Sequence, residues 1–296
     1  MGIYLSKPNT TKDSHDGDSS YLQYGVSAMQ GWRMNMEDAH ITNTALPGEA
    51  ALFAVFDGHG GQEVARFCGK YFTDELVKNE NFRNGNFKRA LEETFLKMDS
   101  ILSGENAMDV LREFKNETEG QTFAGCTANV VLVTRNEIYC ANAGDSRCYL
   151  FTKDNQCLPM STDHKPDVET ERSRIHAAGG YVSEGRVNDN LNLTRAIGDL
   201  EYKKNPQLPP EAQIISAFPD VKVHPLTKDI NFMLIGCDGI WETLTANEIG
   251  KIAEMRLANK NQLSKICEEL LDKLIAKDTS EGTGCDNMSL IMVQFK

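Results

Sequence analysis

The sequence has little positive charge and no long apolar run. Its 296 residues include 31 Lys and Arg against 43 Asp and Glu, which gives a formal net charge of −12. This balance argues against a nucleic-acid binder, because such proteins neutralise phosphates with Lys and Arg. No stretch approaches the roughly 18 consecutive apolar residues that a membrane-spanning helix needs. A content of 40% hydrophobic and 25% charged residues is typical of a folded globular protein.

Several common catalytic and metal-binding patterns are also absent. The eight cysteines include no Cys-x-x-Cys pair, which excludes a zinc ribbon. There is no Cys-x5-Arg, no P-loop and no Gly-x-Ser-x-Gly elbow. The N-terminus lacks the apolar run of a secretory signal, so we expect reduced thiols and a cytoplasmic protein.

The apolar patterns predict one large domain of strands and helices. Short apolar runs bounded by Gly, Asn and Asp predict largely antiparallel strands at Ala50–Phe56, Thr127–Thr134, Ile138–Ala141, Phe232–Cys237 and Met288–Val293. Apolar residues at helical spacing predict helices at Gln62–Val77, Asn86–Leu102 and Gln262–Ile275. A capping box at Thr245 and Glu248 predicts the start of another helix. The polar stretch 7–20 predicts an arm, so we divide the chain into an arm at 1–20 and a single folded domain at 21–296.

Acidic residues stand at the ends of the strongest predicted strands, next to glycine. Asp57 and Asp238 directly follow apolar runs, Asp145 comes just after one, and Asp286 just precedes one. Any one Asp-Gly pair is an ordinary turn. Several carboxylates gathered at one sheet edge would repel one another, and a hard divalent cation such as Mg²⁺ or Mn²⁺ removes that repulsion. The set as a whole therefore favours a metal site over turns.

Two further side chains add to this hypothesis. His59 lies between glycines two residues after Asp57, where it suits a general acid that protonates a leaving oxygen. Arg33 lies four residues before Glu37, and a guanidinium can clamp a phosphate in a bidentate manner. A packed histidine and a solvated arginine are the alternatives.

Six short motifs together contain these residues. They are Arg33-Met34-Asn35-Met36-Glu37-Asp38-Ala39, Val55-Phe56-Asp57-Gly58-His59-Gly60-Gly61, Ala143-Gly144-Asp145-Ser146-Arg147, Thr194-Arg195-Ala196-Ile197-Gly198-Asp199, Cys237-Asp238-Gly239-Ile240-Trp241 and Asp286-Asn287-Met288-Ser289. The motifs resemble those of the protein phosphatase 2C family of metal-dependent serine/threonine phosphatases, and they occur in the family's order from about residue 22 to the end of the chain.

The resemblance implies an α+β fold of four αββα layers, with a central antiparallel β-sandwich flanked by helices. It implies hydrolysis of phosphoserine and phosphothreonine in phosphoproteins by a metal-activated water at a dinuclear Mg/Mn centre, without a phosphoenzyme intermediate. It also implies roles for individual residues: metal ligation by Glu37, Asp57, the Gly58 carbonyl, Asp238 and Asp286, a weaker third metal at Asp145 with Asp238, support of the ligands by Asp38, phosphate contact by Arg33 and general acid catalysis by His59.

Some positions depart from the family pattern. Asp189 stands where a glycine is usual, Asn192 where a small residue is usual, and Glu242 where Asp is common. The first two bear on a flap at about 165–200, and therefore on substrate preference more than on catalysis.

The chain's first residues match an N-myristoylation signal at Gly2, with Ser6 in place. One acyl chain gives only marginal membrane binding, so we expect transient membrane contact at most. The expected protein is a monomer, mainly cytoplasmic, with a membrane-associated or nuclear fraction left open. Two alternatives also stay open: a catalytically silent module that binds a phosphorylated partner, and a phosphohydrolase for phosphotyrosine or small phosphate esters.

Overall fold

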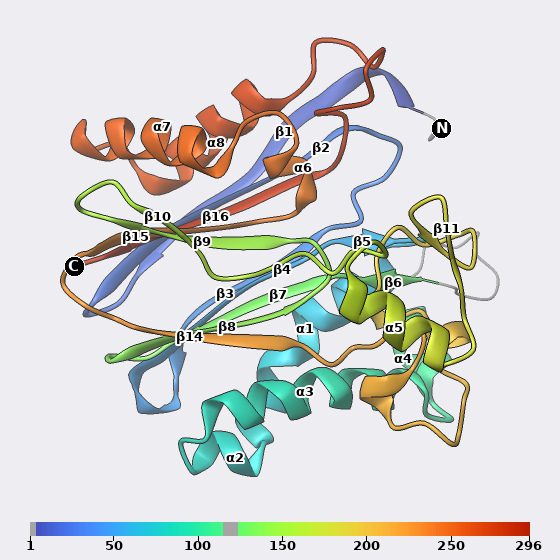
Figure 1. Ribbon diagram of the computed structural model, residues 1–296. Helices are drawn as coiled ribbons and strands as arrows, with labels where there is room; N and C mark the ends of the chain where they lie inside the picture. Colours follow the sequence, from blue (N-terminus) through green and yellow to red (C-terminus); the bar gives the residue numbers. More distant parts are fainter. Residues whose placement is uncertain (1–3, 115–123) are drawn as a thin grey trace.

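The computed structural model describes residues 4–114 and 124–296, and its helices and strands form four layers (Figure 1). Two antiparallel sheets stack face to face, and helices cover the outer face of each. This is the αββα arrangement that the family resemblance implies, so the predicted fold is confirmed.

The first sheet has the strand order β1-β2-β16-β15-β9-β10. Its strands are β1 (Tyr4–Asp18), β2 (Leu22–Arg33), β9 (Arg147–Thr152), β10 (Cys157–Pro159), β15 (Ile230–Gly236) and β16 (Met288–Phe295). Its outer face is covered by α7 (Ala246–Ala258) and α8 (Leu263–Leu274), drawn in orange and red in Figure 1. The apolar stripe of α8 is buried in the same core as β2, β15 and β16, because burying that stripe stabilises the helix on the sheet.

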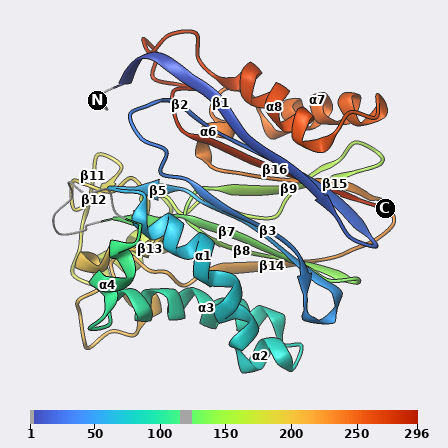
Figure 2. The ribbon, with the colours of Figure 1, turned by 180° about the vertical axis from the view of Figure 1, so that it is seen from behind.

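The second sheet has the order β14-β8-β7-β4-β3. Its strands are β3 (Ala39–Leu46), β4 (Ala50–Phe56), β7 (Ala128–Val133), β8 (Glu137–Ala143) and β14 (Asp220–Pro225). Its outer face is covered by α1 (Glu63–Lys78) and α3 (Phe87–Leu102), with the short α2 (Glu80–Arg83) and α4 (Ala107–Arg112) beside them (Figure 2). Every residue of β4 and β7 is buried, because these strands lie between the other sheet and the helices.

Most of the remaining elements gather at one end of the sandwich. Strands β13 (Ile197–Gly198), β6 (Gly125–Cys126) and β5 (Gly58–His59) form a small sheet, and β11 (Val182–Ser183) pairs with β12 (Arg186–Val187). Helices α5 (Glu169–Ala177) and α6 (Asp238–Trp241) and three 3₁₀ turns complete the fold, the turns being η1 (Pro47–Glu49), η2 (Leu200–Tyr202) and η3 (Pro210–Ala212). The flap that the sequence predicts at about 165–200 contains α5, β11, β12 and β13.

The predicted elements agree with the structure to within a few residues. Ala50–Phe56 is β4 itself, and Gln62–Val77 and Gln262–Ile275 correspond to α1 and α8. The capping box at Thr245 is also present, with hydrogen bonds in both directions between Thr245 and Glu248. The cysteines are free, and all but the half-buried Cys157 are buried.

The predicted N-terminal arm is wrong. Most of residues 7–20 belong to β1, an edge strand that pairs antiparallel with β2 from Tyr4 opposite Arg33 to Asp18 opposite Gln23. An edge strand has one face and one edge in water, so a polar sequence satisfies it and the apolar alternation that signals a strand is absent. Gly2, the predicted acylation site, lies outside the described residues. Within them, no helix combines the length and apolarity that crossing a bilayer requires.

Strand β1 also provides a capping side chain for helix α8, which covers its sheet. The Asp16 carboxylate accepts hydrogen bonds from the Ser264 backbone N–H at 2.8 Å and from the Ser264 hydroxyl at 2.5 Å, in the first turn of α8. Such a carboxylate satisfies a free helix donor and complements the positive end of the helix dipole.

We therefore expect Asp16→Ala to lower the free energy of unfolding by about 1–2 kcal/mol in urea denaturation followed by circular dichroism. Asp13→Ala is the matched control. Asp13 is an exposed carboxylate on the same strand with no hydrogen bond or ion pair to the described residues, and its loss should cost less than about 0.5 kcal/mol. Equal effects of the two substitutions would contradict the capping role.

Candidate active site

The acidic residues that the sequence singles out converge on one cleft at the end of the sandwich. Asp57 directly follows β4, Asp145 precedes β9, Asp238 opens α6 and Asp286 lies just before β16. Glu37 lies between β2 and β3. The cleft has a volume of about 790 Å³, and its walls include all of these acids together with Gly58, Arg33 and His59.

Glycines allow the acid-bearing turns to approach one another closely. A Cβ on Gly58 would lie 2.4 Å from the Glu37 carbonyl oxygen, and a Cβ on Gly239 would lie 2.4 Å from the Asn287 carbonyl oxygen. Neither glycine has a positive φ. The glycine in these two Asp-Gly pairs is therefore explained by close packing of neighbouring chain segments and not by turn geometry.

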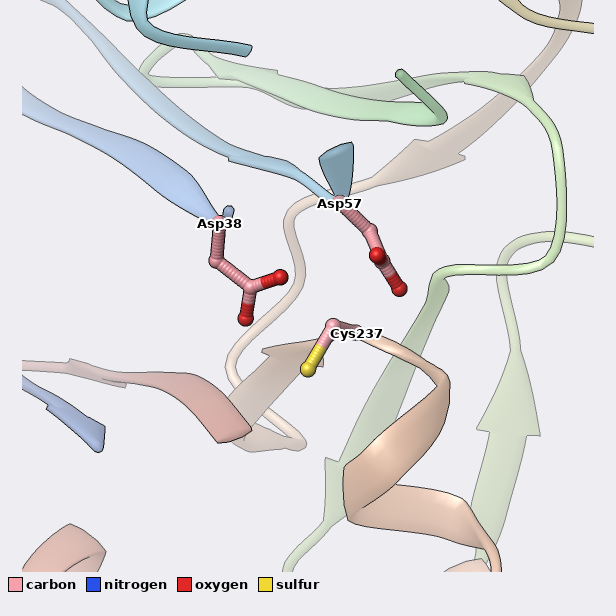
Figure 3. Close-up of side chains that lie close together, drawn as sticks. All are labelled: Asp38, Asp57 and Cys237. Atoms are coloured by element: carbon pink, nitrogen blue, oxygen red, sulfur yellow. The ribbon is translucent and has the colours of Figure 1, made fainter. Parts of the chain in front are cut away.

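The carboxylates form two tight groups. Oxygens of Asp238, Glu242 and Asp286 lie within 4.8 Å of one another, and so do the ligand atoms of Asp38, Asp57 and Cys237. Figure 3 shows the second group, in which the Asp38 and Asp57 carboxylates and the Cys237 thiol come from three separate segments. Asp38 is absent from the cleft wall, and its carboxylate accepts a hydrogen bond from the Ser289 hydroxyl at 2.7 Å. Asp38 therefore lies behind the acids of the cleft.

Crowding and burial make these acids hard to ionise. Burial, together with the Asp238, Asp38 and Asp286 carboxylates, raises the pKa of Asp57 well above its ordinary value. Burial and the neighbouring acids raise the pKa of Asp238 to about 8 and that of Asp38 to about 7. Burial also raises the pKa of Glu37. A set of carboxylates that repel one another suits a hard divalent cation, because the cation's charge stabilises the ionised forms.

Arg33 and His59 both face the acidic cleft. The Arg33 guanidinium pairs with Asp286 at 2.5 Å, and its side chain is 46% exposed at the rim. The His59 Nε2 lies 2.7 Å from an oxygen of Asp199. Burial alone would lower the pKa of His59, but the Asp199 carboxylate outweighs it and raises that pKa above its ordinary value.

Sequence reasoning missed four residues that complete the site. Asp199 is part of a quoted motif, yet nothing in the sequence shows that it reaches His59. The Lys165 ammonium contacts the Asp145 carboxylate. Asn287 accepts a hydrogen bond from the Glu37 backbone N–H at 2.9 Å and donates to the carbonyl oxygens of Gln30 and Asn35. Glu242, noted only as a departure, joins the group of Asp238 and Asp286 and accepts a hydrogen bond from the Gly284 N–H at 2.7 Å.

The flap explains one of the departures from the family pattern. Asp189 has φ of +59° and Asn188 has φ of +47°, a backbone conformation that glycine adopts most easily and that Asn and Asp tolerate better than other residues. The Asp189 carboxylate accepts a hydrogen bond from the Tyr181 hydroxyl at 2.5 Å, which ties this turn to the flap. Asn192 is exposed in the cleft wall, so its longer side chain meets no steric barrier in the core.

We expect the metal-free protein to lose stability as the pH rises from 6.5 to 8.5. Asp238 and Asp57 have raised pKa values when folded, so the folded state retains protons that the unfolded state has released. Stability therefore falls with rising pH until these groups ionise in the folded state as well. The loss should be roughly 1–3 kcal/mol in urea denaturation with chelator. His40, whose pKa burial lowers, opposes the trend only weakly, because in the unfolded state it has released most of its proton by about pH 7.5.

The Asp238→Asn variant should flatten this pH dependence, since it removes one of the titrating groups and part of the repulsion on the others. Addition of Mn²⁺ at pH 8.5 should restore the stability of the unmodified chain and have a smaller effect on the variant. A stability that rises between pH 6.5 and 8.5 in chelator would contradict this account of the carboxylates.

Comparisons with known proteins agree on a single family. The sequence profile of the family described as "Protein phosphatase 2C" matches residues 22–283. The chain is 51% identical over 296 residues to "Probable protein phosphatase 2C 6" of Paramecium tetraurelia, with all of both chains covered. It is 39% identical to "Probable protein phosphatase 2C 21" of Arabidopsis thaliana, covering 100% of this chain and 93% of that one.

Solved structures share the fold. A phosphatase from a pathogenic strain of Toxoplasma gondii has a TM-score of 0.77 at 25% identity, with 96% of each chain covered. A serine-threonine phosphatase 2C from the same organism has a TM-score of 0.78 at 19% identity, with 99% of each chain covered. Because the family profile spans most of the sequence and full-length relatives exceed 50% identity, the chain belongs to the protein phosphatase 2C family.

Proposed function

We propose that this chain is a Mg²⁺- or Mn²⁺-dependent phosphatase that hydrolyses phosphoserine and phosphothreonine in proteins, without a phosphoenzyme intermediate. One observation carries the proposal: acids from distant segments line a single cleft together with Arg33 and His59. Membership of the family supports it, as do the names of the relatives.

The chain's own carboxylates would hold the cations. Asp57, the Gly58 carbonyl, Glu37, Asp238 and Asp286 would hold a pair, and Asp145 with Asp238 would hold a weaker third. All of them line the same cleft. Bound there, divalent cations supply positive charge for the substrate phosphate and lower the pKa of a water molecule toward neutrality.

Arg33 and His59 would act on the two ends of the scissile bond. The Arg33 guanidinium extends from the end of β2 and offers parallel N–H donors to phosphate oxygens. His59 would protonate the serine or threonine oxygen as it leaves, because an alkoxide is a poor leaving group. With Nε2 directed to Asp199, the proton would come from Nδ1.

The form of the cleft favours a protein substrate. Its volume of about 790 Å³ exceeds the space that a phosphate group alone requires, and the exposed Met34 and the flap residue Leu191 belong to its walls beside the acids. The two apolar side chains offer contact area to residues that flank a phosphorylated side chain.

We expect hydrolysis of a phosphothreonine peptide to depend on Mn²⁺, to stop with chelator and to return when Mn²⁺ is added in excess. Asp238→Asn should lower kcat/KM by at least about a hundredfold, since it removes a metal-binding charge. Asp272→Asn removes an exposed carboxylate that pairs with Lys12, outside the walls of the cleft, and should leave activity unchanged. A phosphate-release assay measures all three proteins.

The same assay separates the alternatives. Activity that chelator does not affect would contradict the proposal. If a phosphotyrosine peptide or small phosphate esters are hydrolysed faster than the phosphothreonine peptide, those compounds are the better candidates for the substrate. Binding of a phosphopeptide without turnover or Mn²⁺ uptake in calorimetry would favour a silent binding module.

We expect His59→Ala to lower turnover of the phosphothreonine peptide by roughly 10²–10⁴-fold, the usual contribution of a general acid. The loss should be much smaller with p-nitrophenyl phosphate, because its leaving group is stable without a proton. Calorimetry should show Mn²⁺ affinity close to that of the unmodified chain. Equal losses on the two substrates would mean that His59 is not the acid.

A further inference from the structure

The His59 side chain has a buried partner that no motif assigns. His59 Nε2 and Asp199 Oδ2 are 2.7 Å apart, although the residues are separated by 140 positions in the chain. The Asp199 side chain is 2% exposed and that of His59 is 26% exposed. One end of the hydrogen bond is therefore fixed in the protein interior, and the other reaches the cleft.

The backbone at Asp199 has an unusual conformation that directs its carboxylate. Asp199 has φ of 49° and ψ of 39°, in the left-handed region that non-glycine residues seldom adopt. Its N–H donates to the Ala124 carbonyl oxygen at 3.1 Å. The preceding residue, Gly198, donates its N–H to Asp99 on α3 at 2.8 Å, and the same carboxylate pairs with Lys203 at 2.5 Å. The conformation is thus held by contacts on both sides of Asp199.

The small sheet β13-β6-β5 sets the position of both partners. Gly125 of β6 pairs with His59 of β5 and with Gly198 of β13. A Cβ on Gly125 would lie 2.4 Å from Asp199 Oδ2 and 2.7 Å from His59 Nε2. The β6 backbone therefore covers the hydrogen bond directly, and only glycine leaves room for it.

We propose that Asp199 is a positioning residue for His59. It would hold the imidazole through Nε2 and keep Nδ1 directed toward the oxygen that leaves phosphorus. This inference rests on the proposed function, because it assigns a partner to the group that protonates the leaving oxygen. Asp199 itself would contact neither substrate nor metal. The alternative is a structural role, in which the bond only secures the turn after β13.

Kinetics on two substrates separate the two roles. Asp199→Asn should lower kcat for the phosphothreonine peptide by about tenfold to a hundredfold with little change in KM, as is typical when the partner of a functional histidine is removed. Turnover of p-nitrophenyl phosphate should change less than about threefold. In the His59→Ala background, Asp199→Asn should cause no further loss, because Asp199 acts only through His59. Asp272→Asn again serves as the control.

Equal losses on both substrates, or a further loss in the His59→Ala background, would overturn the inference while the proposed phosphatase function stands. An unmodified chain that hydrolyses neither substrate in Mn²⁺ would instead overturn the proposed function. In that case ¹⁵N NMR of the imidazole still tests the contact. When the imidazole is neutral, the His59 ring should carry its single proton on Nε2 in the unmodified chain and change its tautomer or its signals in Asp199→Asn, and identical spectra would reject the positioning role.

Gly125→Ala provides an independent variant. Its methyl group would enter the space of the hydrogen bond, so it should reproduce the selective loss on the peptide without removing any polar group. Thermal melting identifies a variant that fails to fold, in which case Asp199→Asn and the NMR measurement decide. A folded Gly125→Ala protein with unchanged turnover of both substrates would contradict the inference.

Discussion

Mutual repulsion among carboxylates at one end of the sandwich is the constraint that the rest of the molecule must offset. Asp57, Asp238 and Asp286 belong to segments far apart in the sequence. The Asp238 and Asp286 carboxylates raise the pKa of Asp57, and the Asp286 carboxylate also raises the pKa of Asp238. No folded chain gains stability from such a group by itself. The strands that carry it lie in two apolar cores, which hold the turns together against this repulsion. The site is therefore unfavourable for the metal-free fold and favourable for a bound cation.

Much of the fold and of the site could be predicted from sequence, because periodic burial leaves a periodic pattern. The helices α1, α3 and α8 each bury one stripe, and β4 is buried on both faces, so their apolar residues identify them. Acidic residues directly before or after such strands can be recognised in the sequence because they border an apolar run. Pattern reasoning thus finds residues whose neighbours in sequence are also constrained by burial.

What the sequence did not reveal depends on contacts between distant segments. Strand β1 is polar because it lies at an edge, and its pairing with β2 leaves no apolar alternation. Asp199 reaches His59 only because the small sheet aligns β5 with β13 across Gly125. The left-handed φ of Asp199 and the close approach at Gly125 have no local signature, since Asp and Gly occur in many ordinary turns. Such contacts need the three-dimensional structure.

Some acids in the cleft form a salt bridge with a Lys or Arg side chain of the protein, and others do not. Lys165 contacts Asp145, and Arg33 contacts Asp286, whereas no salt bridge from the described residues reaches Asp57 or Asp238. A metal cation at Asp145 must therefore displace or accommodate the Lys165 ammonium. A metal cation at Asp57 meets only carboxylates, which repel one another and attract the cation. By this electrostatic argument, a cation would bind more strongly at Asp57 than at Asp145. This difference supports the proposal of one tightly held pair of cations and a weaker third, without any difference in ligand type.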